Sequence, residues 1–217
     1  NSHPLTFILS PSGGEGRVRG RRSGRKSTTV EVHWLGHAAT KLTSLTGKVI
    51  VIDPFLTPNP KTPPQYKNLD ALGHVDVILL THGHFDHIAD VAELAKRTGA
   101  KVYGPAGLIA TLLDLGWIPP EQGVRFGKGG KVTPVGPQIV ITQTRAEHSS
   151  EVTVTDPVTK KSTTYPGGEP AGFIIEFENG FKLYHMGDSG LFGDMRLIGD
   201  YYKPDLIMIP VGGHFVM

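Results

Sequence analysis

The ten residues THGHFDHIAD, at positions 81–90, hold three histidines and two aspartates directly after the apolar run VDVILL. Imidazole nitrogens and carboxylate oxygens are ligands that Zn²⁺, Fe²⁺ and Mn²⁺ accept. Alternate side chains of an extended segment share a direction, so His82, His84 and Asp86 could face one cavity, and a turn could return His87 to it. Without a cation such a cluster is repulsive and poorly solvated, so a solvated loop is the weaker interpretation. We therefore expect a metal site here.

The pattern H-x-H-x-D-H after an apolar strand resembles the signature of the metallo-β-lactamase superfamily. That superfamily takes a third histidine for its first metal from the end of a later strand, which RAEHSS would supply as His148. It takes a bridging aspartate from a further strand end, which LYHMGDSG would supply as Asp188. The segments WLGHA, IDPF and GDSGLFGDM resemble a subgroup of small metal-dependent hydrolases related to L-ascorbate-6-phosphate lactonase. The resemblance covers the chain from about residue 30 to its end.

The resemblance implies two divalent metal ions, with zinc as the first choice and manganese or iron as alternatives. Its ligand set assigns the first ion to His82, His84 and His148, the second to Asp86 and His87, and the bridge to Asp188. A metal-bound hydroxide would then attack the substrate, and the ions would stabilise the developing oxyanion. Asp86 could also orient the attacking water or move its proton. The sequence has no cysteine and no G-x-S-x-G motif, which fits a reaction without a protein nucleophile.

Two further polar residues stand at predicted strand ends, His37 in WLGHA and Asp53 in VIDPF. The resemblance places both near the cavity, where either could orient a ligand histidine through its second ring nitrogen. A hydrogen bond that only stabilises a loop is an equal alternative for each. His185, just before the predicted bridging aspartate, is expected to be a core or surface histidine whose hydrogen bonds are satisfied.

The C-terminal end departs from the family pattern. The superfamily usually takes a last histidine for the second metal from a C-terminal strand and loop, whereas this sequence ends at IPVGGHFVM. The pattern therefore predicts a chain truncated by one βα unit. His214 could replace that histidine as a catalytic ligand, although the subgroup has a histidine at this position anyway. We expect the second metal to bind more weakly than the first, and an open sheet edge to make the chain a homo-oligomer.

The elements that must position these residues form a pattern typical of a layered α/β protein, with helices outside and sheets between. Short β-rich runs come first, VEVHWL, ATKLTSL and KVIVID, and the proline-rich stretch 54–70 is predicted to be an ordered loop. Residues 88–99 and 105–116 have helical spacing, and 151–170 has the character of a hairpin. DLIMIP is expected to be a buried strand. The resemblance narrows the fold to a four-layer αββα sandwich, C-terminally truncated.

Composition and charge limit the classes of function. The 217 residues, 38% hydrophobic and 19% charged, suit one soluble domain, residues 30–217, after a basic leader, residues 1–29. RVRGRRSGRK carries six of the 22 Lys and Arg, and without the leader 16 bases face 19 acids, a net charge of −3. We interpret the leader as disordered, and the acidic body argues against a nucleic-acid partner. With no apolar run of membrane-spanning length and no convincing signal, we expect a cytoplasmic protein without a membrane partner.

The leading hypothesis is a metal-dependent hydrolase that acts on a small-molecule ester, lactone or related acyl compound, β-lactams included. A phosphodiesterase or nuclease of the ribonuclease Z type is an alternative, because ribonuclease Z relatives use the same ligand pattern. A non-catalytic metal-binding module that kept the site is a second alternative. The loops at 54–70 and 151–170 would set the specificity, and a loop sequence does not reveal the shape of a pocket.

Overall fold

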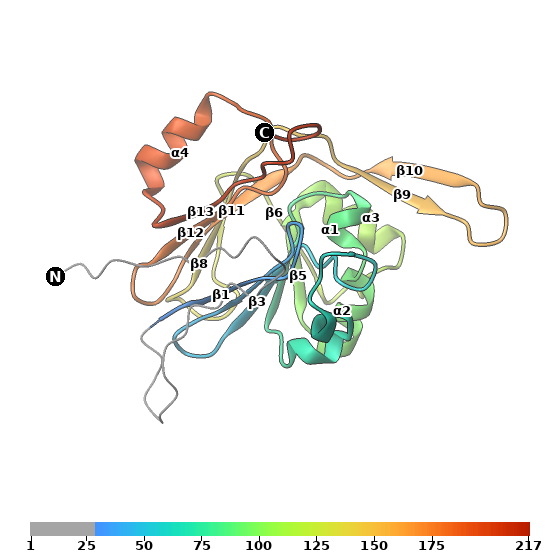
Figure 1. The fold of residues 1–217 in the computed structure, drawn as a ribbon, viewed down its shortest axis with the longest axis horizontal. Helices are drawn as coiled ribbons and strands as arrows, with labels where there is room; N and C mark the ends of the chain where they lie inside the picture. The colour runs from blue at the N-terminus through green and yellow to red at the C-terminus, as the bar shows by residue number, and fades with distance from the viewer. Residues whose placement is uncertain (1–28) are drawn as a thin grey trace.

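The computed structural model describes residues 29–217, so the expected basic leader lies outside the described residues except at its last position. Two sheets face each other at the centre (Figure 1). The first has six strands in sequence order: β1 Glu31–Trp34, β2 Thr40–Thr43, β3 Val49–Ile52, β4 Val77–Leu79, β5 Lys101–Pro105 and β6 Gly123–Phe126. The second has five, in the order β13 Leu206–Met208, β12 Lys182–His185, β11 Ala171–Glu176, β8 Val140–Arg145 and β7 Lys131–Val132. The main helices are α2 Val91–Thr98, α3 Ala106–Asp114 and α4 Asp194–Tyr202.

Alternating apolar side chains on the strands produce the layers. On β3, Val51 packs with α2 and α3, whereas Ile52 packs against the second sheet. On β11, Phe173 faces the first sheet, and Ile174 packs with α4 on the outer side. Because successive side chains of a strand point to opposite faces, strands that are apolar on both faces need a covering layer on each. The predicted four-layer αββα sandwich is confirmed.

Strand direction brings several strand ends to one edge of the sandwich. β3 and β4 run parallel, so both end at this edge. β11 runs antiparallel to β8 and to β12, so the ends of those two strands lie beside the start of β11. The backbone N–H of Ala171, at the start of β11, donates to the carbonyl of Thr81, just past β4, at 2.9 Å. The loops that follow β3, β4, β8 and β12 therefore meet.

Two local predictions are wrong. The stretch 54–70 is not only a loop, because the 3₁₀ helix η1 Pro64–Lys67 lies in it and η2 Leu69–Leu72 begins in it. DLIMIP forms β13, but β13 is an edge strand, which leaves Ile207 43% and Ile209 52% exposed. The other strand and helix predictions are confirmed, although the helix expected from residue 88 begins at Val91, after the one-turn helix α1 Phe85–Ile88.

The predicted hairpin at 151–170 is confirmed as a two-stranded arm, β9 Glu151–Thr155 and β10 Ser162–Pro166, that projects from the sandwich (Figure 1).

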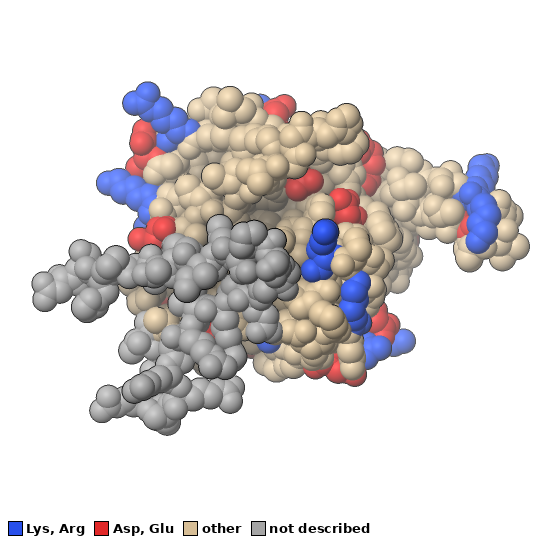
Figure 2. Space-filling model, in the orientation of Figure 1, with Lys and Arg blue, Asp and Glu red and all other residues tan. Residues whose placement is uncertain are grey.

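On the face shown in Figure 2, the coloured Lys and Arg side chains are dispersed among acidic ones and form no single basic patch. None of the helices in residues 29–217 is long and apolar enough to cross a membrane. The homo-oligomer expected from the sequence stays a prediction. Apolar side chains near the C-terminal end that are exposed and could take part in such an interface are Ile207, Ile209, Val211 and Phe215.

Candidate metal centre

Three groups of potential metal ligands meet at the edge where the loops converge, and within each group the donor atoms lie within 4.8 Å of one another. The groups are His82, His84 and His148; His82, His87 and Asp188; and His37, Asp86 and His87. All six ligands expected from the sequence are therefore brought together, from α1 and from the loops after β4, β8 and β12. Because the groups share members, their donors form one continuous cluster.

The backbone differs from the prediction at Asp86. His84 is extended, with φ −69° and ψ 148°, but α1 begins at the next residue, so Asp86 and His87 lie in the first turn of a helix. The alternation along an extended segment therefore ends at His84, and Asp86 is grouped with His37 and His87 instead of with His82 and His84.

The buried carboxylate of Asp53 fixes two of the histidine rings. Nδ1 of His87 donates to Oδ2 of Asp53 at 2.7 Å, and neither side chain has any exposed surface. The hydroxyl of Thr81 donates to the same oxygen at 2.6 Å, so it can only accept from Nδ1 of His82, 3.0 Å away. Both rings thus carry a proton on Nδ1, and Nε2 of each points into the cluster, where it presents a lone pair in the neutral form of the ring.

His84 is held the opposite way round. Its Nε2 donates to Oε2 of Glu151, at the base of the arm, at 2.8 Å, which leaves a lone pair on Nδ1. Glu151 is a contact that sequence reasoning missed, because 67 residues separate it from His84 and no motif links the two. Thr81 was also missed, although its position directly before His82 is a signal that could have found it.

The facing lone pairs test whether a cation belongs in the cluster. Nε2 of His82 lies 3.0 Å from Nδ1 of His84, and in these tautomers neither nitrogen carries a hydrogen, so their contact is repulsive unless a cation lies between them. Nε2 of His87 is buried without a hydrogen-bond partner, 3.4 Å from Oδ2 of Asp188. Two nitrogens bound to one tetrahedral Zn²⁺ at about 2.0–2.1 Å lie about 3.3 Å apart. The donor set therefore fits a divalent ion of the zinc kind.

Charge distinguishes the two halves of the cluster. Burial lowers the pKa of His82 well below its ordinary value, and the neighbouring His87 and His84 lower it further. Burial also opposes the charged form of His87, but Asp53 and Asp188 outweigh it and raise the pKa of His87 to about 10. A hydrogen bond from His37 is the main cause that lowers the pKa of Asp86 to about 2. At neutral pH His82 is ready to bind a cation, whereas a cation at His87 must displace a proton.

A close approach of backbone segments places Asp188. The residue before it, Gly187, has φ +63°, a conformation that favours glycine. A Cβ atom on Gly187 would lie 2.8 Å from Cβ of Thr81 and 2.9 Å from the carbonyl oxygen of Ala171. Only glycine therefore lets the loop after β12 cross the end of β4 and direct Asp188 into the cluster.

Two other histidines lie outside the cluster. His185 is buried, donates from Nε2 to the carbonyl of Ala38 at 3.0 Å and accepts at Nδ1 from the N–H of Gly187 at 3.2 Å, so the predicted satisfied histidine is confirmed. His214 joins none of the ligand groups found among residues 29–217. It is exposed in the C-terminal segment, where its ring packs edge-on against Phe215, so the structure does not place it as a replacement ligand.

Comparison with known proteins agrees with this geometry. Residues 48–215 match the model of the β-lactamase superfamily domain. Over 188 residues the chain is 59% identical to a UPF0173 metal-dependent hydrolase of Cupriavidus necator, covering 86% of this chain and 65% of that protein. It is 54% identical to one of Polaromonas sp., covering 86% of this chain and 68% of that protein. The chain thus spans about two thirds of the length of these curated relatives.

Solved structures share the fold. A metallohydrolase of the archaeon Ignicoccus hospitalis is 34% identical with a TM-score of 0.72, covering 88% of this chain and 74% of that one. A possible metal-dependent hydrolase of Veillonella parvula, 18% identical, has a TM-score of 0.60 over 88% of this chain and 74% of that one, which is a likeness of fold alone. The family model, the identity to the curated relatives and the shared sandwich lead to one conclusion. This chain belongs to the β-lactamase superfamily and, within it, to the UPF0173 metal-dependent hydrolase family.

Proposed function

We propose that this chain is a hydrolase that works with two divalent metal ions, zinc first and manganese or iron as alternatives. One observation carries the proposal: in His82, His84 and His87 one ring nitrogen is held by a hydrogen bond, and the other points into the cluster, where a cation can bind it in place of a proton. Histidines with no metal to bind have no reason to be oriented this way, because the arrangement brings lone pairs together. The family's name, metal-dependent hydrolase, supports the same function.

The chain's residues divide the chemistry as follows. His82, His84 and His148 would hold one ion, Asp86 and His87 the other, with Asp188 between the two. Such ions, when bound, lower the pKa of a water molecule and polarise the bond to be broken. Asp86 is ionised at neutral pH and partly exposed, so it can accept a hydrogen bond from that water and orient it. No side-chain nucleophile is required, which suits a sequence without cysteine.

We further propose a small ester, lactone or related acyl compound as the substrate. The resemblance of WLGHA, IDPF and GDSGLFGDM to lactonase-related hydrolases supports this class. The excess of acids over bases after residue 29, and the dispersed basic side chains in Figure 2, disfavour a nucleic-acid backbone as substrate. Phe55, in the stretch 54–70, packs edge-on against the ring of His37, and Glu151, at the base of the arm, bonds to His84, so both segments would form walls of the substrate site.

A panel of substrates tests the proposal on the full chain loaded with zinc. The panel contains nitrophenyl esters, lactones, a β-lactam and a nitrophenyl phosphodiester. We expect turnover of an ester or lactone that a chelator removes, that zinc restores, and that Asp188→Asn abolishes. Asp156→Asn, at an exposed turn of the arm, is the matched control and should keep full activity. Cleavage of the phosphodiester alone would favour a nuclease, and metal binding without any turnover would favour a non-catalytic module.

A further inference from the structure

We propose that His37 is a direct ligand of the second metal ion, together with Asp86 and His87. This inference rests on the proposed metal-dependent function and adds a donor to its second site. From the sequence alone, His37 could be a residue that only orients a ligand histidine. The inference gives it the role of a ligand instead. The ligand comes from the turn between β1 and β2, an element that supplies no other member of the cluster.

Convergence of donor atoms is the first argument. The ligand atoms of His37, Asp86 and His87 all lie within 4.8 Å of one another. Nε2 of His37 is 3.2 Å from Oδ2 of Asp86. Because Nδ1 of His87 is bonded to Asp53, the donor that His87 offers to this group is Nε2, which is buried and has no hydrogen-bond partner. The rings of His37 and His87 meet edge-on, with centroids 5.1 Å apart, which suits donors that converge on one point.

Backbone strain is the second argument. His37 has φ +55°, which is uncommon for a residue other than glycine. The turn is nevertheless held firmly: the carbonyl of His37 accepts from Nε1 of Trp34 at 2.6 Å, and the N–H of Leu35 donates to the carbonyl of Ala39 at 2.8 Å. A glycine here would remove the strain and also the imidazole. Strained residues are common at functional sites, and of the four non-glycine residues with positive φ among residues 29–217, two are His37 and Asp53, which bonds to His87 of the cluster.

A second pair in the chain shows what His37 and Asp86 would look like without a metal role. Nε2 of His74 lies 3.2 Å from Oδ1 of Asp76, the same separation as in the His37–Asp86 pair. His74 is 74% exposed, Asp76 also pairs with Lys48, and neither His74 nor Asp76 belongs to a ligand group found among residues 29–217, so that pair is an ordinary histidine–carboxylate contact. His37 is 36% exposed, faces a third ligand atom and belongs to a ligand group. The two pairs therefore form a matched test and control.

The test is a zinc titration of the metal-stripped full chain against a competing chromophoric chelator. Asparagine tolerates the left-handed backbone at position 37, so His37→Asn removes the imidazole without adding strain. His74→Asn is the control. We expect the wild type and His74→Asn to bind two equivalents, and His37→Asn to keep the first equivalent while binding the second more than about 100-fold more weakly. Residues that only orient a ligand cost about 10–100-fold, so a larger loss marks a ligand.

Each outcome decides a separate claim. A loss of less than about 100-fold for the second equivalent in His37→Asn overturns the inference and leaves the two-ion proposal standing. A wild-type chain that binds fewer than two equivalents overturns the two-ion proposal and the inference together. Retention of the first equivalent shows that the variant is folded at the site. Absorption spectra with cobalt in place of zinc give a second readout, since loss of a nitrogen ligand must change the bands of the second ion and leave those of the first.

Discussion

Replacing Asp53 with asparagine should destabilise the metal-free protein, because this carboxylate satisfies three buried donors. It accepts from the N–H of Thr81 at 2.8 Å, from the Thr81 hydroxyl at 2.6 Å and from Nδ1 of His87 at 2.7 Å. Asparagine matches the shape of aspartate and tolerates φ +47°, so the substitution isolates the loss of charge. Its NH₂ group must replace either Oδ2, where it faces the Thr81 hydroxyl and the His87 N–H, or Oδ1, where it faces the N–H of Thr81, so donors oppose each other in both orientations.

The magnitude follows from burial. A lost hydrogen bond to a charged group costs about 1.5–3 kcal/mol, and breaking a buried ion pair costs about 3–5 kcal/mol. Both side chains are fully buried, so solvent screening does not reduce these values. We expect the free energy of unfolding to fall by about 2–5 kcal/mol, which lowers Tm by roughly 4–20 °C in a protein of this size. Zinc affinity should fall about 10–100-fold, because His87 and Thr81 lose their anchor.

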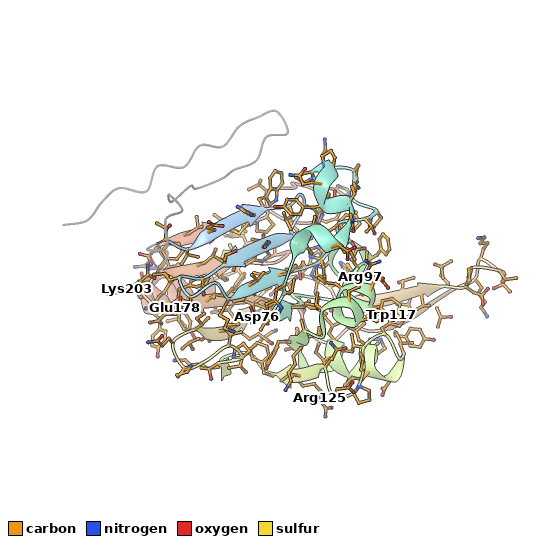
Figure 3. All side chains as sticks on the ribbon, turned by 90° about the horizontal axis from the view of Figure 1, so that it is seen from below. Asp76, Arg97, Trp117, Arg125, Glu178 and Lys203 are labelled. Carbon is orange, nitrogen blue, oxygen red and sulfur yellow. The ribbon has the colours of Figure 1, made fainter. Side chains whose placement is uncertain are left out.

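Urea unfolding followed by circular dichroism, with chelator present at pH 7, measures the change. Asp76→Asn is the control: Asp76, labelled in Figure 3, accepts from the N–H of Val49 at 2.8 Å and from Lys48 at 3.1 Å. It lies before β4, at the end of that strand remote from the cluster; its side chain is 10% exposed and that of its partner Lys48 is 43% exposed, so water can replace the Lys48 contact. A loss for Asp53→Asn no larger than that for Asp76→Asn would refute the reasoning.

Three further predictions concern the surroundings of the cluster. Folding raises the pKa of His87 to about 10, so the protonated ring stabilises the folded, metal-free protein. The free energy of unfolding of the metal-free protein should therefore fall as pH rises from 7 to 9, whereas that of the zinc-loaded protein should not. Equal pH profiles in urea unfolding would contradict this. Glu151→Ala should weaken binding of the first zinc ion about 10-fold, because it releases Nε2 of His84, and should change the free energy of unfolding by less than about 0.5 kcal/mol. Glu147→Ala, which removes a partner of Arg145, is the control and should leave zinc titrations unchanged. Gly187→Ala should cost about 1–3 kcal/mol in thermal unfolding and weaken metal binding, because its Cβ would meet Thr81 and Ala171; a fully stable variant would be unexpected.

The sequence was sufficient to predict the layers of the fold and the convergence of the candidate ligands. Apolar runs such as VIVI in β3 pack on both faces, and that pattern alone requires cover on each side of the sheet. The dense donors at 82–87 predicted the position of the cluster, and the resemblance added His148 and Asp188, which the fold brings in from other strand ends. These features were predictable because strand ends and short-range spacing are local properties of a sequence.

Contacts between segments far apart in sequence were not predictable. Glu151 reaches His84 only because the arm begins beside the end of β4, and no sequence motif records that contact. The burial of DLIMIP was overestimated because an apolar run does not reveal whether its strand is central or at an edge. The direction expected for the Asp86 side chain, toward His82 and His84, was wrong because a one-turn helix begins at Phe85. A turn so short has too few residues to show a helical period in the sequence.

The most direct test of the metal centre is the metal content per chain, measured by elemental analysis of the purified full chain after mild dialysis and again after dialysis against zinc. We expect close to two ions of the zinc, manganese or iron kind per chain, with His84→Ala and Asp188→Asn reduced in parallel. A wild-type chain that retains no metal and takes up none from zinc would contradict the assignment of this cluster as a metal centre.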